Sequence, residues 1–481
     1  MSKKHVLAVF CLLAGTALPS FAYAQAAASS NTTITPNGTP NPNHPTPPPT
    51  ASHTNDAGDP DLPALKAGNL FSPKAGRPLT YWDGLVGHVT VEAGISGNPW
   101  TRSGRNFGQF YLDRANTVTL NQIMGSLSHP VTSIGSGYGI GFVVEMMYGS
   151  DSRFDPTIGM GDGTISGLYQ WAPTQAHIDI HTPWIFHHGI DFQAGQMYGL
   201  MGAEGTPALA RPFYSFNYAA DYIVPFETVG LVATMHLSHH MDWILGIDAG
   251  NSTTFGGAGN NSRPKGYFGF AWNNLMGGKL NVHAIGHFGP QANNGRTIVS
   301  PAGWNSAGIG RSANDLMQYN ADLLATYHVT DALSVMAEAL YLHDDASRDD
   351  AYGVSSYLSW DIQPSLTLNV RGEIFRDNTG GIISQYSSDM SYTNSLRNRP
   401  FEYYNALPTT YGDLTVGVAY RPSFINRHLG PASLTVRPEI RLDKSLNGTH
   451  PFNQSGTVSS RTVNNGTNNM LWFNLDAVLS F

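Results

Sequence analysis

The chain has 481 residues, one cysteine and a net charge of −8 at pH 7 with histidine neutral, and 12% of its residues are charged. A net negative chain is a poor partner for nucleic acid, and a single thiol excludes disulfide frameworks and cysteine-ligated clusters. Beyond the first residues no apolar run is long enough for a membrane-spanning helix, so a place in a membrane would require strands that alternate their faces.

The first 24 residues have the three parts of a secretory signal peptide. Lys3 and Lys4 form the positive region, residues 6–18 the apolar core, and residues 22–24 a small-residue cleavage site. This core is shorter than the ~20 residues of a spanning helix, so we expect the signal to be removed after export. Cys11 lies in the core without a lipobox, so we expect no lipid anchor and a mature protein without a thiol.

Residues 25–80 are rich in Pro, Ser, Thr and Asn and hold few apolar side chains in their first part. Such a composition predicts a disordered periplasmic tail. The tail could be a plain spacer or a tether to the cell wall or to another envelope protein, and the sequence does not decide between them.

From residue 81 to residue 481 the hydrophobic pattern has a period of two, and the last segment shows it best. One parity is apolar, with Leu471, Phe473, Leu475, Ala477, Leu479 and Phe481. The other parity holds Trp472, Asn474, Asp476, Val478 and Ser480. Lipid on one face and water on the other explains this pattern. A last strand that ends on an aromatic residue resembles the signal by which outer-membrane barrels are recognised for insertion, a role that falls to Phe481.

Sixteen such segments can be counted, at 84–96, 116–125, 138–149, 174–182, 189–199, 229–238, 241–251, 265–274, 279–289, 316–328, 333–344, 351–361, 365–377, 411–421, 432–443 and 470–481. Bacterial single-chain barrels have an even number of strands, and sixteen leave an aqueous lumen. We therefore predict an all-β fold, a transmembrane antiparallel β-barrel of about 16 strands. A soluble β-sandwich would also alternate, but it would not need the terminal aromatic strand.

Long polar stretches separate some of these strands, near 150–173, 200–228, 290–315, 378–410 and 444–469. Barrels of this class have short periplasmic turns and long outer loops. One of the long stretches could fold inward as a constriction, and the sequence does not say which.

Residues 139–154 end in Tyr-Gly-Ser-Asp-Ser-Arg-Phe, and further distinctive stretches lie at 175–181, 189–199, 211–218 and 225–231. These stretches resemble the beta-barrel porin-2 family of outer-membrane proteins, also called OmpL-like. The resemblance implies an outer-membrane barrel with a pore function and offers no catalytic residues. The tail and the 378–410 stretch are peculiar to this chain.

Charged side chains occupy one parity of the predicted strands, which would face the lumen. We predict that eight of them line the pore: Glu92, Arg371, Glu373, Arg437, Glu439, Arg441, Asp443 and Asp476. Opposed charges on neighbouring walls would set a transverse field that favours polar solutes, or they would simply neutralise one another.

Other chemistry finds little support in the sequence. His177, Asp179 and His181 share one strand face, but such positions are ~6.6 Å apart, too wide for one ion, so we expect no metal site and no cofactor. No nucleophile elbow or zinc-protease motif occurs, so no catalytic residue is predicted.

The sequence therefore predicts a Gram-negative outer-membrane porin for passive diffusion of ions and small hydrophilic solutes. Its expected partners are membrane lipid, the barrel assembly machinery and the solutes, and a homo-oligomer is compatible with the pattern. The alternatives are a barrel that serves as scaffold for an enzyme or adhesin, and a soluble periplasmic binding protein.

Overall fold

The computed structural model describes residues 84–133, 137–162, 167–186, 188–255, 263–291, 313–397, 399–424, 432–454 and 462–481. The predicted signal peptide and all of the predicted tail lie outside the described residues. Their boundaries, at residues 24 and 80, therefore stay predictions.

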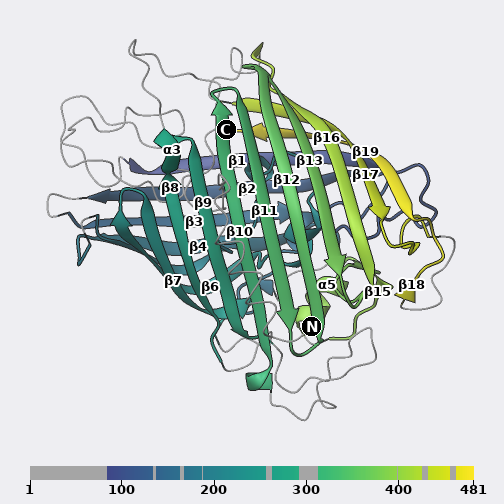
Figure 1. Ribbon diagram of the computed structural model, residues 1–481, viewed down its shortest axis with the longest axis horizontal. Coiled ribbons are helices and arrows are strands. Elements are labelled where there is room, and N and C mark those ends of the chain that lie inside the picture. The colour runs from purple at the N-terminus through teal and green to yellow at the C-terminus, as the bar shows by residue number, and fades with distance from the viewer. Residues whose placement is uncertain are drawn as a thin grey trace.

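Sixteen strands close into one antiparallel barrel, as predicted. They are β1 Val86–Gly97, β2 Val118–Ser133, β3 Gly139–Gly149, β4 Gln170–Thr182, β5 Ile190–Tyr198, β6 Glu227–Ser238, β7 Met241–Asn251, β8 Gly266–Asn274, β9 Leu280–Pro290, β10 Met317–Thr330, β11 Leu333–Asp344, β12 Asp349–Gln363, β13 Leu366–Asp377, β16 Thr409–Tyr420, β17 Ser433–Ser445 and β19 Asn469–Ser480. Figure 1 shows β9 to β13 crossing in front of β1 to β4, which form the far wall.

The first and last barrel strands pair with each other and close the ring. Val91 on β1 is paired with Leu479 on β19, and the backbone of Phe481 exchanges hydrogen bonds with Val89, at 2.9 and 3.2 Å. Closure leaves no strand edge of the barrel unpaired, as a structure in lipid requires.

Apolar side chains cover the outside of the barrel and polar ones its inside. On β19, Leu471, Phe473 and Leu475 are exposed, whereas Asn474 and Asp476 are buried. The same alternation runs along β13, where Arg371 and Glu373 are buried and Ile374 is exposed. A soluble sandwich would bury its apolar face, so that alternative is wrong.

Connections at one end of the barrel are short, as between β6 and β7 or between β12 and β13, and most at the other end are long. The long connections carry β14 Ser384–Tyr386, β15 Tyr403–Ala406 and β18 Thr462–Val463, which form a separate small sheet, and most of the short helices: η2 Asp151–Arg153, η4 Ala208–Ala210, α2 Tyr218–Tyr222, η5 Ala313–Asp315 and α5 Ser391–Leu396. A further short helix, α3 Leu275–Gly278, lies between β8 and β9. In the described part of the chain, no helix has the length and apolar character needed to cross a membrane.

The strand bounds differ from prediction most at β2, which was expected to end at residue 125 and continues to Ser133. Its register with β3 is irregular between His129 and Thr132. Pro130 lies within this irregular stretch and has no N–H to donate to the ladder. The irregularity breaks the alternation on which the prediction depended.

Candidate functional site

Residues 199–226 join β5 to β6 and fold into the barrel interior. We call them the inward segment. Almost all of their side chains are buried, although the connection lies at the end of the barrel where long loops would otherwise meet water. The predicted stretch at 200–228 therefore enters the lumen.

Large aromatic side chains of the inward segment are buried, and their burial favours its packing inside the barrel. Phe213, Tyr214, Phe216 and Tyr218 are each no more than 2% exposed. Burial of such side chains stabilises the packed arrangement by about 2 kcal/mol each. Asn217 starts helix α2, because its side-chain oxygen accepts a hydrogen bond from the third residue of the helix at 2.5 Å.

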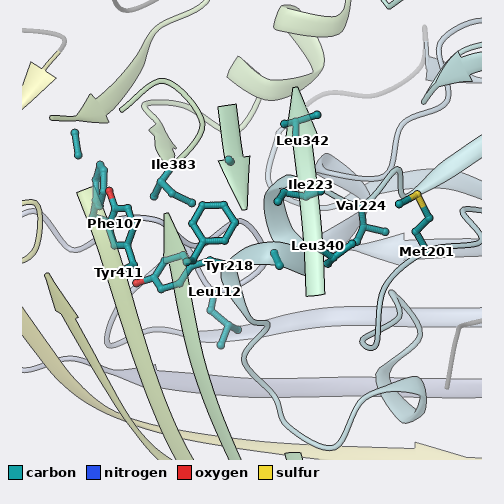
Figure 2. Packing of buried hydrophobic residues seen from close by; sticks show 14 of the residues in the cluster. Phe107, Leu112, Met201, Tyr218, Ile223, Val224, Leu340, Leu342, Ile383 and Tyr411 are labelled. Atoms are coloured by element: carbon teal, nitrogen blue, oxygen red, sulfur yellow. The ribbon is translucent and has the colours of Figure 1, made fainter. Parts of the chain in front are cut away.

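The inward segment reaches from one wall of the barrel to another. Figure 2 shows Tyr218 beside Tyr411, which belongs to β16, with the ring centroids 4.9 Å apart. Farther along the segment, Ile223 and Val224 lie near Leu340 of β11 in the same apolar cluster. The segment therefore crosses the lumen and narrows it.

Arginines of the barrel wall donate to backbone carbonyls of the segment. Arg371 donates to the carbonyl of Ser215 at 2.8 Å and forms an ion pair with Glu204 at 2.7 Å. Arg441 donates in the same way to the carbonyl of Phe216. A guanidinium has five donors in a planar fork, so one side chain can hold both a carboxylate and a peptide.

Arg437 of β17 also binds backbone carbonyls of the segment, and we call such contacts between wall charges and the segment the long-range anchor. It donates to the carbonyls of Ala208 and Arg211 at 2.7 and 2.8 Å. The same guanidinium pairs with Glu92 at 2.9 Å and with Asp476, and Arg211 also reaches Glu92 at 2.8 Å. Two arginines and two carboxylates are thereby linked into one buried network.

Carboxylates of the wall accept hydrogen bonds from backbone N–H groups of the segment. Glu439 accepts from Tyr214 at 2.9 Å and from Ser215 at 3.2 Å. Glu373 accepts from Tyr218 at 2.7 Å. Wall charges of both signs thus hydrogen-bond the main chain of the segment, and such charge-assisted bonds are roughly twice as strong as neutral ones.

All eight residues predicted to line the pore face the barrel interior, and each is at most 3% exposed. They are Glu92, Arg371, Glu373, Arg437, Glu439, Arg441, Asp443 and Asp476. Asp443 accepts from the hydroxyl of Tyr218 and from the indole of Trp472, each at 2.7 Å. Their contact with a conducting lumen stays a prediction.

Sequence reasoning missed a second set of packed loops at the same end of the barrel. Phe110, Tyr111, Phe154, Phe216, Ala220 and Phe226 form an aromatic cluster drawn from three connections. Phe110 and Phe154 stack with centroids 5.1 Å apart, and Tyr111 and Phe216 at 4.5 Å. The density of aromatic residues between the predicted strands was the available signal, because solvated loops seldom carry so many.

Two buried acids stabilise these loops. Burial raises the pKa of Asp221 to about 8, although its carboxylate accepts a hydrogen bond from the N–H of Phe110 at 3.3 Å. Burial also raises the pKa of Asp155, which accepts from the hydroxyl of Tyr111 at 3.0 Å. A group with a pKa near 8 is mostly protonated at neutral pH and can then donate as well as accept.

Histidines and aspartates alternate across β4 to β7, at the ends of β5 and β6 opposite to those that the inward segment joins. His181 contacts Asp191 at 2.6 Å, Asp191 contacts His236 at 3.1 Å, and His236 contacts Asp242 at 2.7 Å. The side-chain amide of Asn273 on β8 donates to Oδ2 of Asp242 at 2.7 Å. We call these five residues the histidine ladder.

The candidate metal ligands in this region pair with neighbours. His177 contacts Asp179 at 3.1 Å, and His181 contacts Asp191 of the histidine ladder. Among the described residues, no group of three or more His, Cys, Asp or Glu side chains is placed to hold a metal ion.

A family model described as "Putative beta-barrel porin-2, OmpL-like" matches residues 85–481. No curated protein matches the chain by sequence. Three solved structures are similar to it. The outer membrane channel DcaP of Acinetobacter baumannii has 12% sequence identity and a TM-score of 0.49, and the match covers 82% of this chain and 96% of that one. Pseudomonas putida OprB has 16% identity and a TM-score of 0.48, with coverages of 83% and 94%. An anion-selective porin from Comamonas acidovorans has 9% identity and a TM-score of 0.46, with coverages of 82% and 99%.

Proposed function

The chain belongs to the beta-barrel porin-2, OmpL-like family, and on this premise we propose that it is an outer-membrane channel narrowed by its inward segment. Ions and small hydrophilic solutes would diffuse through it passively. The observation that carries the proposal is a closed barrel of sixteen strands with its charged side chains on the inner face. A barrel of this size encloses more space than its own wall side chains can fill.

The inward segment would set the size limit for solutes. It crosses from β16 to β11 and is held at both its carbonyls and its amides by wall charges. Because these contacts fix the main chain and not only the side-chain ends, we expect a rigid constriction with a steady conductance.

Export by the N-terminal signal and insertion through the barrel assembly machinery complete the proposal. The outward alternation of β19 and the exposed aromatic side chain of Phe481 support the second step. Outer-membrane lipid would contact the apolar outer face.

The test is planar-bilayer conductance of the detergent-folded protein, with the reversal potential measured under a salt gradient. We expect stable steps of uniform size. In Arg371→Gln, the loss of the Glu204 pair and of the bond to Ser215 should loosen the segment, giving larger and noisier steps.

The matched control is Arg376→Gln, which changes the same residue type on the same strand at a position of outward parity. Its conductance should equal that of the unaltered protein. Absence of any step in protein shown to be folded would overturn the channel proposal and favour a scaffold for an enzyme or adhesin.

A further inference from the structure

Six side chains on the inner faces of β9, β10 and β11 each keep one buried nitrogen or oxygen atom without a hydrogen-bond partner among the described residues. They are His283, His287, Asn320, Asp322, Thr326 and Glu338, and we call them the polar file. Each is at most 7% exposed. On β1, β13, β16, β17 and β19, only Tyr411 and Asn474 keep such an atom in the described part of the chain. Unsatisfied polar atoms are therefore concentrated on one wall of the barrel.

The polar file follows the long direction of the strands. The register of β10 with β9 and β11 places the six side chains on four successive levels, at Asn320, Asp322, Leu324 and Thr326. Leu324 has no polar atom, but it faces His283 on one side and Glu338 on the other. Every level thus has at least one unpartnered atom, and the file extends for about 20 Å.

Exposed residues lie beyond both ends of the polar file. On the inner face of β10, Gln318 precedes the file toward the long connections and is partly exposed. At the other end, His328 follows the file toward the short turns and is exposed. The file therefore reaches from one mouth of the barrel to the other along a single wall.

The inward segment covers the polar file with its backbone and with apolar side chains. It makes three backbone hydrogen bonds to the file, at 2.6 to 2.9 Å, through the N–H groups of Gly202 and Ala203 and the carbonyl of Ile223. Ion pairs join the segment to β13 through Arg371 and to β1 through Glu92. Among the described residues, no ion pair joins it to β9, β10 or β11. The seam along the file therefore lacks the ion pairs that close the opposite seam.

A buried polar atom without a partner costs about 1–3 kcal/mol, so the file is unfavourable unless other molecules supply the missing hydrogen bonds. We propose that water and hydrophilic solutes pass the inward segment along the polar file, between the segment and β9 to β11. This inference rests on the channel function proposed above. Since ion pairs hold the main chain of the segment on the opposite wall, we expect the file to open by rotamer changes of the apolar side chains that cover it.

Hydrogen-bond acceptors predominate in the polar file, and this defines the class of solute. The unpartnered atoms on β10 and β11 are all oxygens. Nε2 of His287 donates to Asp248 at 2.8 Å, which leaves Nδ1 of the neutral ring as an acceptor. The file therefore favours solutes that donate several hydrogen bonds, such as polyols and primary ammonium ions, over anions.

Cysteine substitution tests the route, because the only cysteine of the chain is Cys11, in the predicted signal peptide. Thr326→Cys places a thiol in the file. Thr415→Cys is the matched control, since Thr415 is 0% exposed on β16 and accepts a hydrogen bond from Arg371 on the opposite wall. The detergent-folded proteins are placed in planar bilayers and treated with aminoethyl methanethiosulfonate, a small ammonium reagent. Thr326→Cys channels should lose about half or more of their conductance, and Thr415→Cys channels should keep theirs.

A second measurement tests the class of solute. Glu338→Gln replaces a carboxylate with an amide that also donates, so the permeability ratio of ammonium to chloride, taken from reversal potentials, should fall by about twofold or more. An unchanged ratio would overturn the solute class.

The outcomes separate the route from the channel function. Block of Thr415→Cys without block of Thr326→Cys, or block of neither, would overturn the route and leave the channel proposal standing. Folded protein that gives no conductance step before the reagent is added would instead refute the channel proposal, and the route with it.

Discussion

The barrel uses charge differently on its two sides. On β13, β17 and β1, wall charges reach across the lumen to the inward segment, as Arg371 does to Glu204, a residue 167 positions away. On β4 to β8, the histidine ladder joins neighbouring strands, and its longest sequence separation is 45 positions. The same alternating pattern therefore supports a long-range anchor on one side and local strand pairing on the other.

The largest expected effect comes from breaking the long-range anchor. Arg437→Met would leave Glu92 and Asp476 buried beside fewer positive charges and would free two carbonyls of the segment. Breaking a buried pair in this way costs about 3–5 kcal/mol. Urea unfolding in detergent micelles, followed by tryptophan fluorescence, would measure the loss, and a cost below that of a surface substitution would contradict the anchor.

A smaller effect tests how closely the segment approaches the wall. A Cβ at Gly94 of β1 would lie 2.6 Å from Cζ of Tyr214 and 2.7 Å from the carbonyl oxygen of Leu475. Gly94→Val should therefore destabilise the folded barrel by about 1–3 kcal/mol through overpacking. Gly125→Val is the matched control, since nothing lies within 4 Å of a Cβ there, and its effect should stay within about 0.5 kcal/mol.

The acid in helix α2 gives the segment a dependence on pH. Burial raises the pKa of Asp221 to about 8, above its unfolded value of about 4, so its contribution to stability is present at low pH and is lost as pH rises through 8. Between pH 7 and pH 9 the loss should be about 1.4 kcal/mol. Unfolding curves of the unaltered protein and of Asp221→Asn would show it, and an equal slope in both would remove Asp221 as the cause.

The smallest effect should come from the histidine ladder. In His236→Gln, Asp191 and Asp242 keep contacts with His181 and Asn273, so the expected cost is only about 1 kcal/mol. Single-channel conductance should not change. A change in conductance as large as that of Arg371→Gln would show that the two walls are coupled.

Sequence periodicity predicted the barrel well because alternation is a local property that lipid imposes on every strand. The bounds of β7 and β11 were predicted without error. Periodicity also placed Arg437 and Asp476 on the inner face, but it could not show that Arg437 binds carbonyls of residues 208 and 211. That contact depends on the path of an irregular segment, for which no period exists.

The pairing of β1 with β19 also restricts when the barrel can form. One edge of β1 pairs with β2, where Val91 faces Ile123, but the other edge must wait for β19, where Val91 faces Leu479. Until then the growing sheet has two open edges, each able to join a foreign strand. An unfinished chain is therefore an aggregation hazard until β1 and β19 have paired.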